Sequence, residues 1–294
     1  MSKVWLITGS SRGLGWEITK AALAAGHRVV ATARKPEQLH ALVEAHPEHA
    51  RAVALDVSDP GAARAAVEAA VGAFGRLDVV VNNAGYANVC SIEDVSDEDF
   101  RTQFETNFFG LVNVTRAALP VLRKQRDGHI IQISSIGGRK GTPGLSSYQS
   151  AKWAVEGFSE VLHTEVRSLG IRVTIVEPGG FRTDWGGSSM RIDPIHPDYE
   201  QTVGAVRSRL RQGQDGMRGD PAKGAQAIVT VAGMPEPPLR LLLGTDAMFL
   251  AKITAATQAA EDAKWASLSA STDADGLGDF ADTEVAKMLL AMRR

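Results

Sequence analysis

A glycine-rich turn decides the fold of this chain: Thr8-Gly9-Ser10-Ser11-Arg12-Gly13-Leu14-Gly15. An apolar run precedes the turn, and an amphipathic helical pattern over residues 14–25 follows it. Gly9 permits a tight turn, Gly13 lets a ligand approach the backbone, and Gly15 allows close packing of helix against strand. The first N–H groups of a helix attract anions, because they lack partners and lie at the positive end of the helix dipole. The turn therefore predicts a strand, a phosphate-binding loop and a helix, although such turns also occur without a ligand.

Short apolar runs alternate with longer helical patterns along the rest of the chain. We expect strands at 4–8, 28–32, 51–55, 79–81, 129–134, 172–176 and 239–243. We expect helices at 14–25, 36–45, 60–74, 97–125, 148–169, 221–232, 246–270 and 281–294. Strands that are apolar on both faces and joined by helices are typical of parallel sheets. The pattern predicts an α/β, Rossmann-type doubly wound parallel sheet of about seven strands, with helices on both faces.

The alternation also predicts how the chain is divided. Residues 179–220 have weak periodicity and many Gly, Pro, Ser and Asp residues, so we expect a substrate loop at about 180–220. The expected Rossmann-fold domain covers residues 1–245. Residues 246–294 form an expected helical C-terminal extension, interrupted by a polar linker at 271–279.

Composition excludes several classes of function. Lys and Arg total 32 against 34 Asp and Glu, which gives little support to nucleic-acid binding. Cys90 is the only cysteine, so the chain can form neither an internal disulfide nor a multi-cysteine metal site. We expect no membrane span, because no apolar run approaches about 18 residues, and no signal peptide precedes the first strand. A cytoplasmic location without a metal is the expectation.

The end of the second strand indicates which dinucleotide the turn prefers. NAD-binding sites of this kind have a carboxylate there, which accepts a hydrogen bond from the ribose 2′-OH. This chain has Thr32-Ala33-Arg34-Lys35 instead. The planar guanidinium of Arg34 suits a 2′-phosphate, so we expect NADP(H) rather than NAD(H). Arg34 and Lys35 are otherwise solvated charges that open a helix. Asp56 is a candidate to hold the adenine amino group, or else an ordinary turn acid.

Tyr148 and Lys152 lie four residues apart near the start of a helix and therefore share one face. A free tyrosine has a pKa of ~10 and is a poor base at neutral pH. A nearby ammonium favours the phenolate, so Lys152 is expected to lower the pKa of Tyr148. The pair alone is common on helix surfaces.

Other polar residues follow the strands at the carboxyl edge of the predicted sheet, where open α/β sheets bind ligands. They are Ser134-Ser135, Asn82-Asn83-Ala84-Gly85 and Pro178-Gly179. Asn107 lies in the middle of a predicted helix. Asparagine has a low helix propensity, so its presence there favours a specific role for the side chain.

These motifs, in this order, resemble the short-chain dehydrogenases/reductases over about residues 3–185. The resemblance implies that Tyr148 is the general acid/base and that Lys152 lowers its pKa and binds the nicotinamide ribose. It implies that Ser135 polarises the substrate oxygen and that Asn107 holds a water molecule in a proton relay. The family's serine lies thirteen residues before the tyrosine, which selects Ser135 over Ser134. Thr183 would contact the nicotinamide amide.

The complete expected cofactor site combines the turn, the strand ends and the catalytic pair. It comprises Gly9, Ser11, Arg12, Gly13, Leu14, Gly15, Arg34, Asp56, Val57, Asn83, Ala84, Gly85, Tyr148, Lys152, Pro178, Gly179 and Thr183. Residues 177–185 are similar to those of a subset of family members that are often described by analogy with hydroxysteroid dehydrogenases.

The expected reaction is reversible hydride transfer between NADP(H) and an apolar carbonyl or secondary alcohol. An NAD(H)-dependent dehydrogenase of the same fold and a non-catalytic dinucleotide-binding regulator are the alternatives. In the family, helices equivalent to 97–125 and 148–169 pair between subunits, which implies a homodimer or homotetramer. The polar C-terminal extension departs from the glycine-rich ends common in family tetramers.

Overall fold

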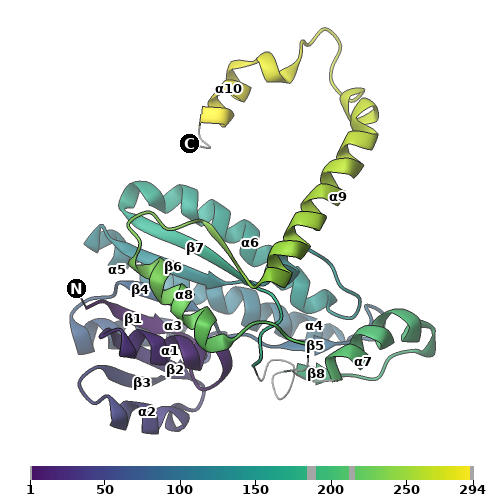
Figure 1. The fold of residues 1–294 in the computed structure, drawn as a ribbon. Helices are drawn as coiled ribbons and strands as arrows, with labels where there is room; N and C mark the ends of the chain where they lie inside the picture. The colour runs from purple at the N-terminus through teal and green to yellow at the C-terminus, as the bar shows by residue number, and fades with distance from the viewer. Residues whose placement is uncertain (1, 184–189, 212–215, 292–294) are drawn as a thin grey trace. The chain divides into compact units, whose positions relative to one another are not determined.

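A parallel sheet of seven strands forms the centre of the computed structural model, which describes residues 2–183, 190–211 and 216–291 (Figure 1). The strands follow the order β3-β2-β1-β4-β6-β7-β9. Their bounds are β1 Val4–Ile7, β2 Arg28–Ala33, β3 Ala50–Ala54, β4 Val79–Asn82, β6 Gly128–Ile133, β7 Ile171–Pro178 and β9 Arg240–Leu243. All six pairings are parallel, which confirms the predicted sheet. The order reverses between β1 and β4, so their carboxyl ends form the crevice where ligands bind in this fold.

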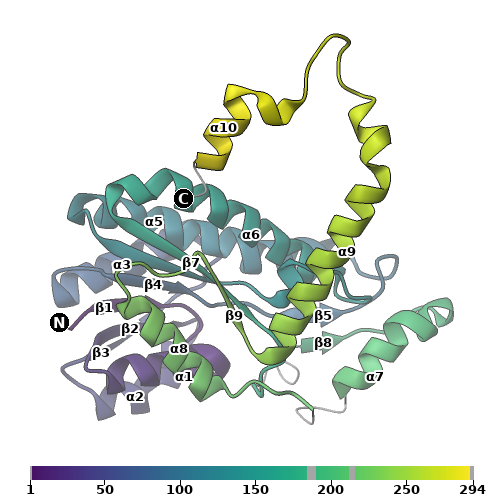
Figure 2. The same ribbon diagram turned by 45° about the horizontal axis from the view of Figure 1, so that its top comes forward.

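Helices cover both faces of the sheet, as Figures 1 and 2 show. One face carries α1 Gly13–Ala24, α2 His40–Ala45 and α8 Pro221–Gly233, and its core includes Trp5, Ile18 and Ile228. The other face carries α3 Pro60–Phe74, α5 Gly110–Gln125 and α6 Ser146–Val166, with Leu6, Leu122 and Ile130 in its core. Alternate strand residues face opposite helical layers, so most residues on both faces of each strand are apolar.

Local signals explain where the helices begin and end. Asp59 accepts a hydrogen bond from Gly61 N at 2.6 Å and caps α3, which has Pro60 at its first position. Ser96 likewise accepts from Asp99 N at 3.1 Å and caps α4 Asp97–Phe104. Gly170 has a φ of 78°, a left-handed conformation that glycine adopts without strain and that ends the helical segment before β7.

The helix expected at 97–125 is interrupted by a π-helical turn. Its three parts are α4, the π turn η2 Glu105–Phe109, and α5. Such turns are rare and occur frequently at functional sites. Asn107 lies inside this turn.

The segment expected as an irregular loop contains regular structure. A short strand, β8 Met190–Ile192, pairs in parallel with β5 Ala87–Val89 in a second, two-stranded sheet. The turns η6 Pro197–Tyr199 and η7 Glu200–Gly204 lead into α7 Ala205–Arg211. Other short turns are η1 Pro36–Leu39, η3 Ile136–Gly138, η4 Arg167–Leu169 and η8 Phe280–Asp282. A three-residue strand and single helical turns are too short to show a period in sequence.

The chain divides into two compact units, residues 1–251 and 252–294. The long helix α9 Thr245–Ala270 begins in the first unit, where Ala247 and Ala251 are buried. The second unit contains the rest of α9 and α10 Glu284–Ala291, and Ala286 is the only buried side chain among its described residues. Among the helices of the described ranges, none is long and apolar enough to cross a membrane.

Candidate active site

The glycine turn between β1 and α1 brings three backbone segments together. Gly9 and Gly13 have φ values of 67° and 58°, in the left-handed region. A Cβ on Gly15 would lie 2.3 Å from Gly9 O and 2.4 Å from Asn83 Nδ2. Gly15 is therefore required mainly by the fold of the turn itself, rather than by packing of the helix against the strand. The N-cap residue of α1 is Arg12, whose guanidinium cannot accept a hydrogen bond from the first N–H groups of the helix. Those N–H groups suit an anionic ligand.

The end of β4 is bonded directly to this turn. Asn83 Nδ2 donates to Thr8 O at 2.9 Å and to Gly9 O at 3.2 Å. Thr8 Oγ1 accepts from the N–H groups of Asn83 and Ala84, each at 2.9 Å. The two strand ends on either side of the crevice are thus held at a fixed separation.

Asn107 and Lys152 approach the same glycine from two helices. A Cβ on Gly85 would lie 2.5 Å from Asn107 Oδ1 and 3.7 Å from Lys152 Nζ. Asn107 Nδ2 donates to Tyr86 O and Gln103 O, each at 3.0 Å. Asn107 Oδ1 is buried and accepts no hydrogen bond from the described residues. An orphaned acceptor beside an ammonium group fits a bound water molecule between them.

Ser135 and Tyr148 are joined by a hydrogen bond between their side chains. Ser135 precedes η3 and also accepts from Gly137 N at 3.0 Å. Ser134 points elsewhere, because its Oγ lies 2.9 Å from the position that a Cβ on Gly138 would take, close to Glu156 on α6. The structure therefore brings Ser135, and not Ser134, to the tyrosine.

Burial shifts the pKa of both Tyr148 and Lys152 in the chain alone. Burial raises the pKa of Tyr148 to about 12, and the hydrogen bond with Ser135 opposes the rise. Burial also lowers the pKa of Lys152 to about 8. Lys152 Nζ donates to Ile133 O at 2.9 Å and lies 5.7 Å from the centre of the Tyr148 ring. The tyrosine pKa is thus raised in the chain alone and not lowered as expected from sequence, because desolvation is the largest effect on it.

The expected adenosine-side residues lie at the ends of β2 and β3. Arg34 is exposed and close enough to Asp56 to help lower the pKa of that carboxyl. Hydrogen bonds from Ser58 lower this pKa more: Asp56 Oδ1 accepts from Ser58 N at 3.0 Å and Ser58 Oγ at 2.7 Å. Asp56 therefore acts as a turn acid in the chain alone. Val57 is buried against the core, as Leu14 partly is, so their side chains face inward.

The end of β7 returns to the glycine turn. Gly179 N donates to Leu243 O at 2.9 Å, which continues the pairing of Pro178 with Leu243 in β9. Thr183 then comes close to the first turn, because a Cβ on Gly13 would lie 3.7 Å from Thr183 Cβ. Residues 178–183 and 9–15 thus approach each other across the carboxyl edge of the sheet.

A buried cluster of ion pairs lies next to this edge of the sheet. Glu177 has no exposed surface, and its Oε1 accepts from Arg139 at 2.8 Å and Arg240 at 2.9 Å. Arg240 also pairs with Glu156 and Glu160 of α6. Burial raises the pKa of Glu177, and the hydrogen bond from Arg139 opposes the rise. The cluster ties the Ser135 loop, α6, β7 and β9 together.

An apolar cluster lies beside Tyr148. Met190 and Val203 from the expected substrate loop pack with Val89 and Leu145 in the cluster that contains Tyr148. Tyr199 packs at its margin and donates from its hydroxyl to Glu93 at 2.7 Å. Trp185, another candidate for an apolar pocket, lies outside the described residues. These contacts fit an apolar substrate.

Cys90 adjoins this region without an exposed thiol. It is buried, and its backbone bridges to Leu145. Burial raises the pKa of the thiol, which disfavours the reactive thiolate. Cys90 therefore acts as a small packing residue.

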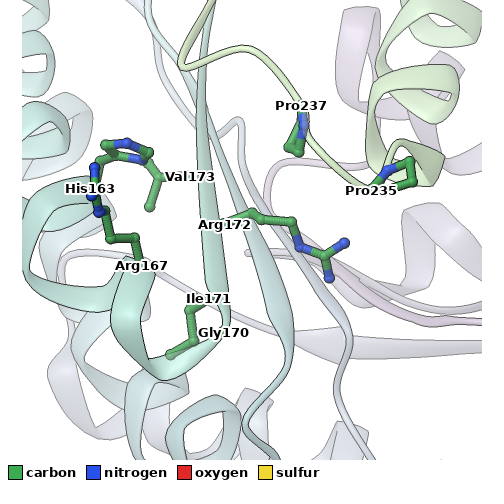
Figure 3. A pocket seen from close by; sticks show the side chains of 8 residues that line it. All are labelled: His163, Arg167, Gly170, Ile171, Arg172, Val173, Pro235 and Pro237. Atoms are coloured by element: carbon green, nitrogen blue, oxygen red, sulfur yellow. The ribbon is translucent and has the colours of Figure 1, made fainter. Parts of the chain in front are cut away.

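A cavity of about 310 Å³ lies away from these residues (Figure 3). His163, Arg167 and Arg172 line it, together with the start of β7 and Pro235 and Pro237. Ligands of doubly wound sheets bind at the carboxyl ends of the strands, whereas this cavity opens at the amino end of β7. Its position, at the opposite end of β7 from Ser135, Tyr148 and Lys152, argues against it as the reaction site.

The sequence and fold match known proteins over most of the chain. A family model described as short chain dehydrogenase matches residues 3–191. The chain is 53% identical over 270 residues to Oxidoreductase BOA17 of Botryotinia fuckeliana (strain B05.10), covering 92% of this chain and 98% of that protein. The crystal structure of a short-chain dehydrogenase from Streptomyces avermitilis has a TM-score of 0.87 and 41% identity, and covers 93% of this chain and 99% of that one.

A second similar structure is an alcohol dehydrogenase from the archaeon Thermococcus sibiricus, solved in complex with 5-hydroxy-NADP. Its TM-score is 0.69 at 26% identity, with coverage of 83% of this chain and 96% of that chain. With the family model, the relative and the two structures in agreement, the chain belongs to the short-chain dehydrogenase/reductase family of oxidoreductases.

Proposed function

We propose that this protein is an NADP(H)-dependent oxidoreductase that interconverts an apolar carbonyl and a secondary alcohol, with Tyr148 as general acid/base. One observation carries the proposal: Ser135, Tyr148, Lys152 and Asn107 converge at the carboxyl edge of the sheet, opposite a glycine turn with an uncapped helix start. A regulator that only binds a dinucleotide does not require this complete set.

The residues around the crevice fit a dinucleotide. Gly9, Gly13 and the first N–H groups of α1 would hold its pyrophosphate, since their conformation exposes backbone donors. Lys152 would hold the nicotinamide ribose, and Gly179 and Thr183 would lie beside the nicotinamide. When bound, NADPH supplies the hydride for carbonyl reduction.

The chain's own residues account for the proton. Ser135 donates a hydrogen bond to the substrate oxygen and stabilises the negative charge that develops there. Tyr148 Oη protonates that oxygen, because its raised pKa keeps the phenol neutral before the reaction. The ammonium of Lys152 stabilises the phenolate that forms. Asn107 Oδ1 holds a water molecule through which the phenol regains its proton.

Arg34 supports the choice of NADP(H). It lies at the end of β2 with an exposed side chain, and no acid occupies the positions 32–35 around it. Its charge suits a 2′-phosphate, and the similar archaeal alcohol dehydrogenase was solved with an NADP derivative. An NAD(H)-dependent enzyme of the same fold is the second candidate if Arg34 points away from the ribose.

An oxidation assay tests the function directly. The purified protein is mixed with NADPH or NADH and a panel of apolar aldehydes, ketones, quinones and steroids, and absorbance at the reduced-nicotinamide band is followed. We expect turnover with at least one carbonyl and a lower Michaelis constant for NADPH than for NADH. A clear preference for NADH would overturn the cofactor assignment. Binding of NADPH without turnover across the panel would favour the regulatory alternative.

A further inference from the structure

The carboxylate of Asp246 lies against the turn that follows β7. Asp246 belongs to the first turn of α9, within the compact unit that ends at residue 251. Its Oδ2 accepts a hydrogen bond from Gly180 N at 2.7 Å. The segment expected from sequence to be an extension thus begins in contact with the expected cofactor site.

Two glycines make room for this carboxylate. A Cβ on Gly179 would lie 2.4 Å from Asp246 Oδ2, and a Cβ on Gly244 would lie 2.4 Å from Oδ1. Gly244 also has a φ of 103°, which other residues rarely adopt. Any side chain at either position would displace the carboxylate. The backbone is therefore shaped around Asp246.

The turn that Asp246 holds is connected to the rest of the crevice. Gly180 O accepts from Gly219 N at 2.8 Å, and Arg182 N donates back to Gly219 O at 2.9 Å. Thr183 follows directly and reaches the vicinity of Gly13. A displacement of Gly180 would therefore be transmitted both to the residues facing the glycine turn and to the segment that closes the substrate loop.

The second oxygen of the carboxylate has no donor of its own. Asp246 Oδ1 is buried and receives no hydrogen bond from the described residues. Burying an acceptor in this way is unfavourable, and the single hydrogen bond to Gly180 offsets only part of that penalty. A surface helix start requires no such arrangement, whereas a residue that fixes a ligand-binding turn does.

We propose that Asp246 is a positioning residue for the dinucleotide site. It fixes Gly179 and Gly180, and through them the path of the chain to Thr183, without touching the reacting atoms. The inference rests on the proposed function, because it assigns the turn after β7 to the nicotinamide side. It makes the first turn of α9 part of the active site, rather than part of a separate extension.

Direct binding tests the assignment. The dissociation constant for NADPH is measured by its fluorescence, without substrate, for the full-length wild type, Asp246→Ala, Asp246→Asn and Asp262→Ala. Asp262 is the matched control, because it is an exposed acid on the same helix. We expect about a tenfold weaker complex for Asp246→Ala, since a hydrogen bond to a charged acceptor is lost. Asp246→Asn keeps an acceptor for Gly180 N and is expected to weaken binding about threefold.

Steady-state kinetics separate positioning from general damage. A positioning role raises KM for NADPH in Asp246→Ala with little change in kcat or in KM for the carbonyl substrate. A merely structural role lowers the melting temperature without NADPH but leaves the dissociation constant of the folded protein unchanged. Asp262→Ala is expected to match the wild type in kcat, in both KM values, in the melting temperature and in the dissociation constant for NADPH.

The outcomes are distinguishable. Wild-type affinity in folded Asp246→Ala would overturn the positioning role while leaving the proposed function intact. If Asp246→Ala does not fold, Asp246→Asn decides: a threefold weaker complex supports the role, and wild-type affinity overturns it. If the wild type binds neither NADPH nor NADH, the proposed function fails, and the assignment of Asp246 fails with it.

Discussion

Tyr148 is a buried phenol whose environment suits proton donation more than proton abstraction. Its pKa of about 12 in the chain alone keeps the proton in place at neutral pH. Ser135 is bonded to it, and the Lys152 ammonium is near its ring. Under the proposed mechanism, this arrangement would favour carbonyl reduction, since the phenol already carries the proton that it donates.

Replacing Tyr148 with phenylalanine removes the proton donor and little else. We expect kcat for carbonyl reduction to fall about 10³-fold, within the range for loss of a general acid. The dissociation constant for NADPH should stay within about threefold, because the glycine turn is untouched. NADPH oxidation and NADPH fluorescence measure the two quantities. Near-normal turnover in the variant would contradict the mechanism.

The lysine adds a pH dependence. Burial lowers the pKa of Lys152 to about 8, so its ammonium is present below that pH and lost above it. The phenolate that forms on Tyr148 then loses its stabilising cation. We expect kcat/KM for reduction to be level at pH 6–7.5 and to fall as pH rises through about 8. A profile that rises or stays flat up to pH 9.5 would exclude this role of Lys152.

Arg34 is the residue that tests the proposed preference for NADP(H). In Arg34→Ala, we expect KM for NADPH to rise about 10- to 100-fold while KM for NADH changes little, because only NADPH carries the 2′-phosphate. Lys35→Ala is the control, since Lys35 is an adjacent exposed cation. Equal losses for both cofactors would show that Arg34 does not contact the 2′-phosphate.

Among the elements, the pair β6–β7 carries a buried histidine that makes the sheet sensitive to acid. His129 has no exposed surface, and its Nε2 lies 2.9 Å from Thr174 Oγ1 on β7. Burial and, to a smaller extent, the cations of Arg172 and Lys3 together lower the pKa of His129 from 6.5 to about 3. Below pH 6.5, His129 is protonated in the unfolded chain but stays neutral in the folded chain. The free energy of unfolding therefore falls as pH drops from 6.5 toward 3.

His129→Gln tests this sensitivity. Between pH 6.5 and 5, the wild type is expected to lose about 2 kcal/mol of unfolding free energy through His129, and the variant is not. Urea denaturation at pH 7.5, 6.5 and 5 measures the difference. His40→Gln is the control because His40 is exposed. If the wild type and His129→Gln show the same pH dependence, His129 is not responsible.

The sequence predicts the large elements because they repeat a period over many residues. All seven strands of the main sheet and the principal helices could be recognised in this way. The π turn could not, since one extra residue per turn leaves the surrounding apolar pattern nearly unchanged. β5 and β8 could not either, because three residues carry no period. Their pairing depends on contacts between segments about 100 residues apart.

The candidate site was predictable where a motif fixes the spacing, as it does for Ser135, Tyr148 and Lys152. The charge state of Tyr148 was not, because desolvation depends on what covers the phenol. Asp246 was missed for a related reason. Its partners Gly179 and Gly180 lie more than 60 residues away in sequence, although the neighbouring Gly244 and the two glycines are signals that a close approach is needed.

At the scale of the whole molecule, exposed apolar side chains lie on the two segments that the family resemblance implies at a subunit interface. Phe109, Trp153 and Val161 are 44%, 47% and 58% exposed. They lie on η2 and α6, which contact each other through Phe108 and Phe158. Apolar residues gathered on a surface indicate an interface. We therefore propose a homo-oligomer that pairs through residues 97–125 and 148–169.

Light scattering coupled to size-exclusion chromatography measures the state of assembly. We expect the wild type to have two or four times the mass of one chain. Phe109→Glu combined with Trp153→Glu places charges in the interface and is expected to give the monomer. Gln226→Glu, which places a charge at an exposed polar site on α8, is the control. A monomeric wild type, or an assembly that survives the paired substitution, would contradict this interface.

The single buried thiol has a practical consequence. A fluorescent or spin label directed at cysteine reacts with exposed thiolates, and Cys90 is buried with a raised pKa. A cysteine introduced at an exposed position, such as Asp198 in the expected substrate loop or Ser269 in α9, would therefore be labelled alone, with no need to remove the native cysteine. Labels at these two positions would report, in real time, how the substrate loop and α9 respond to cofactor and substrate.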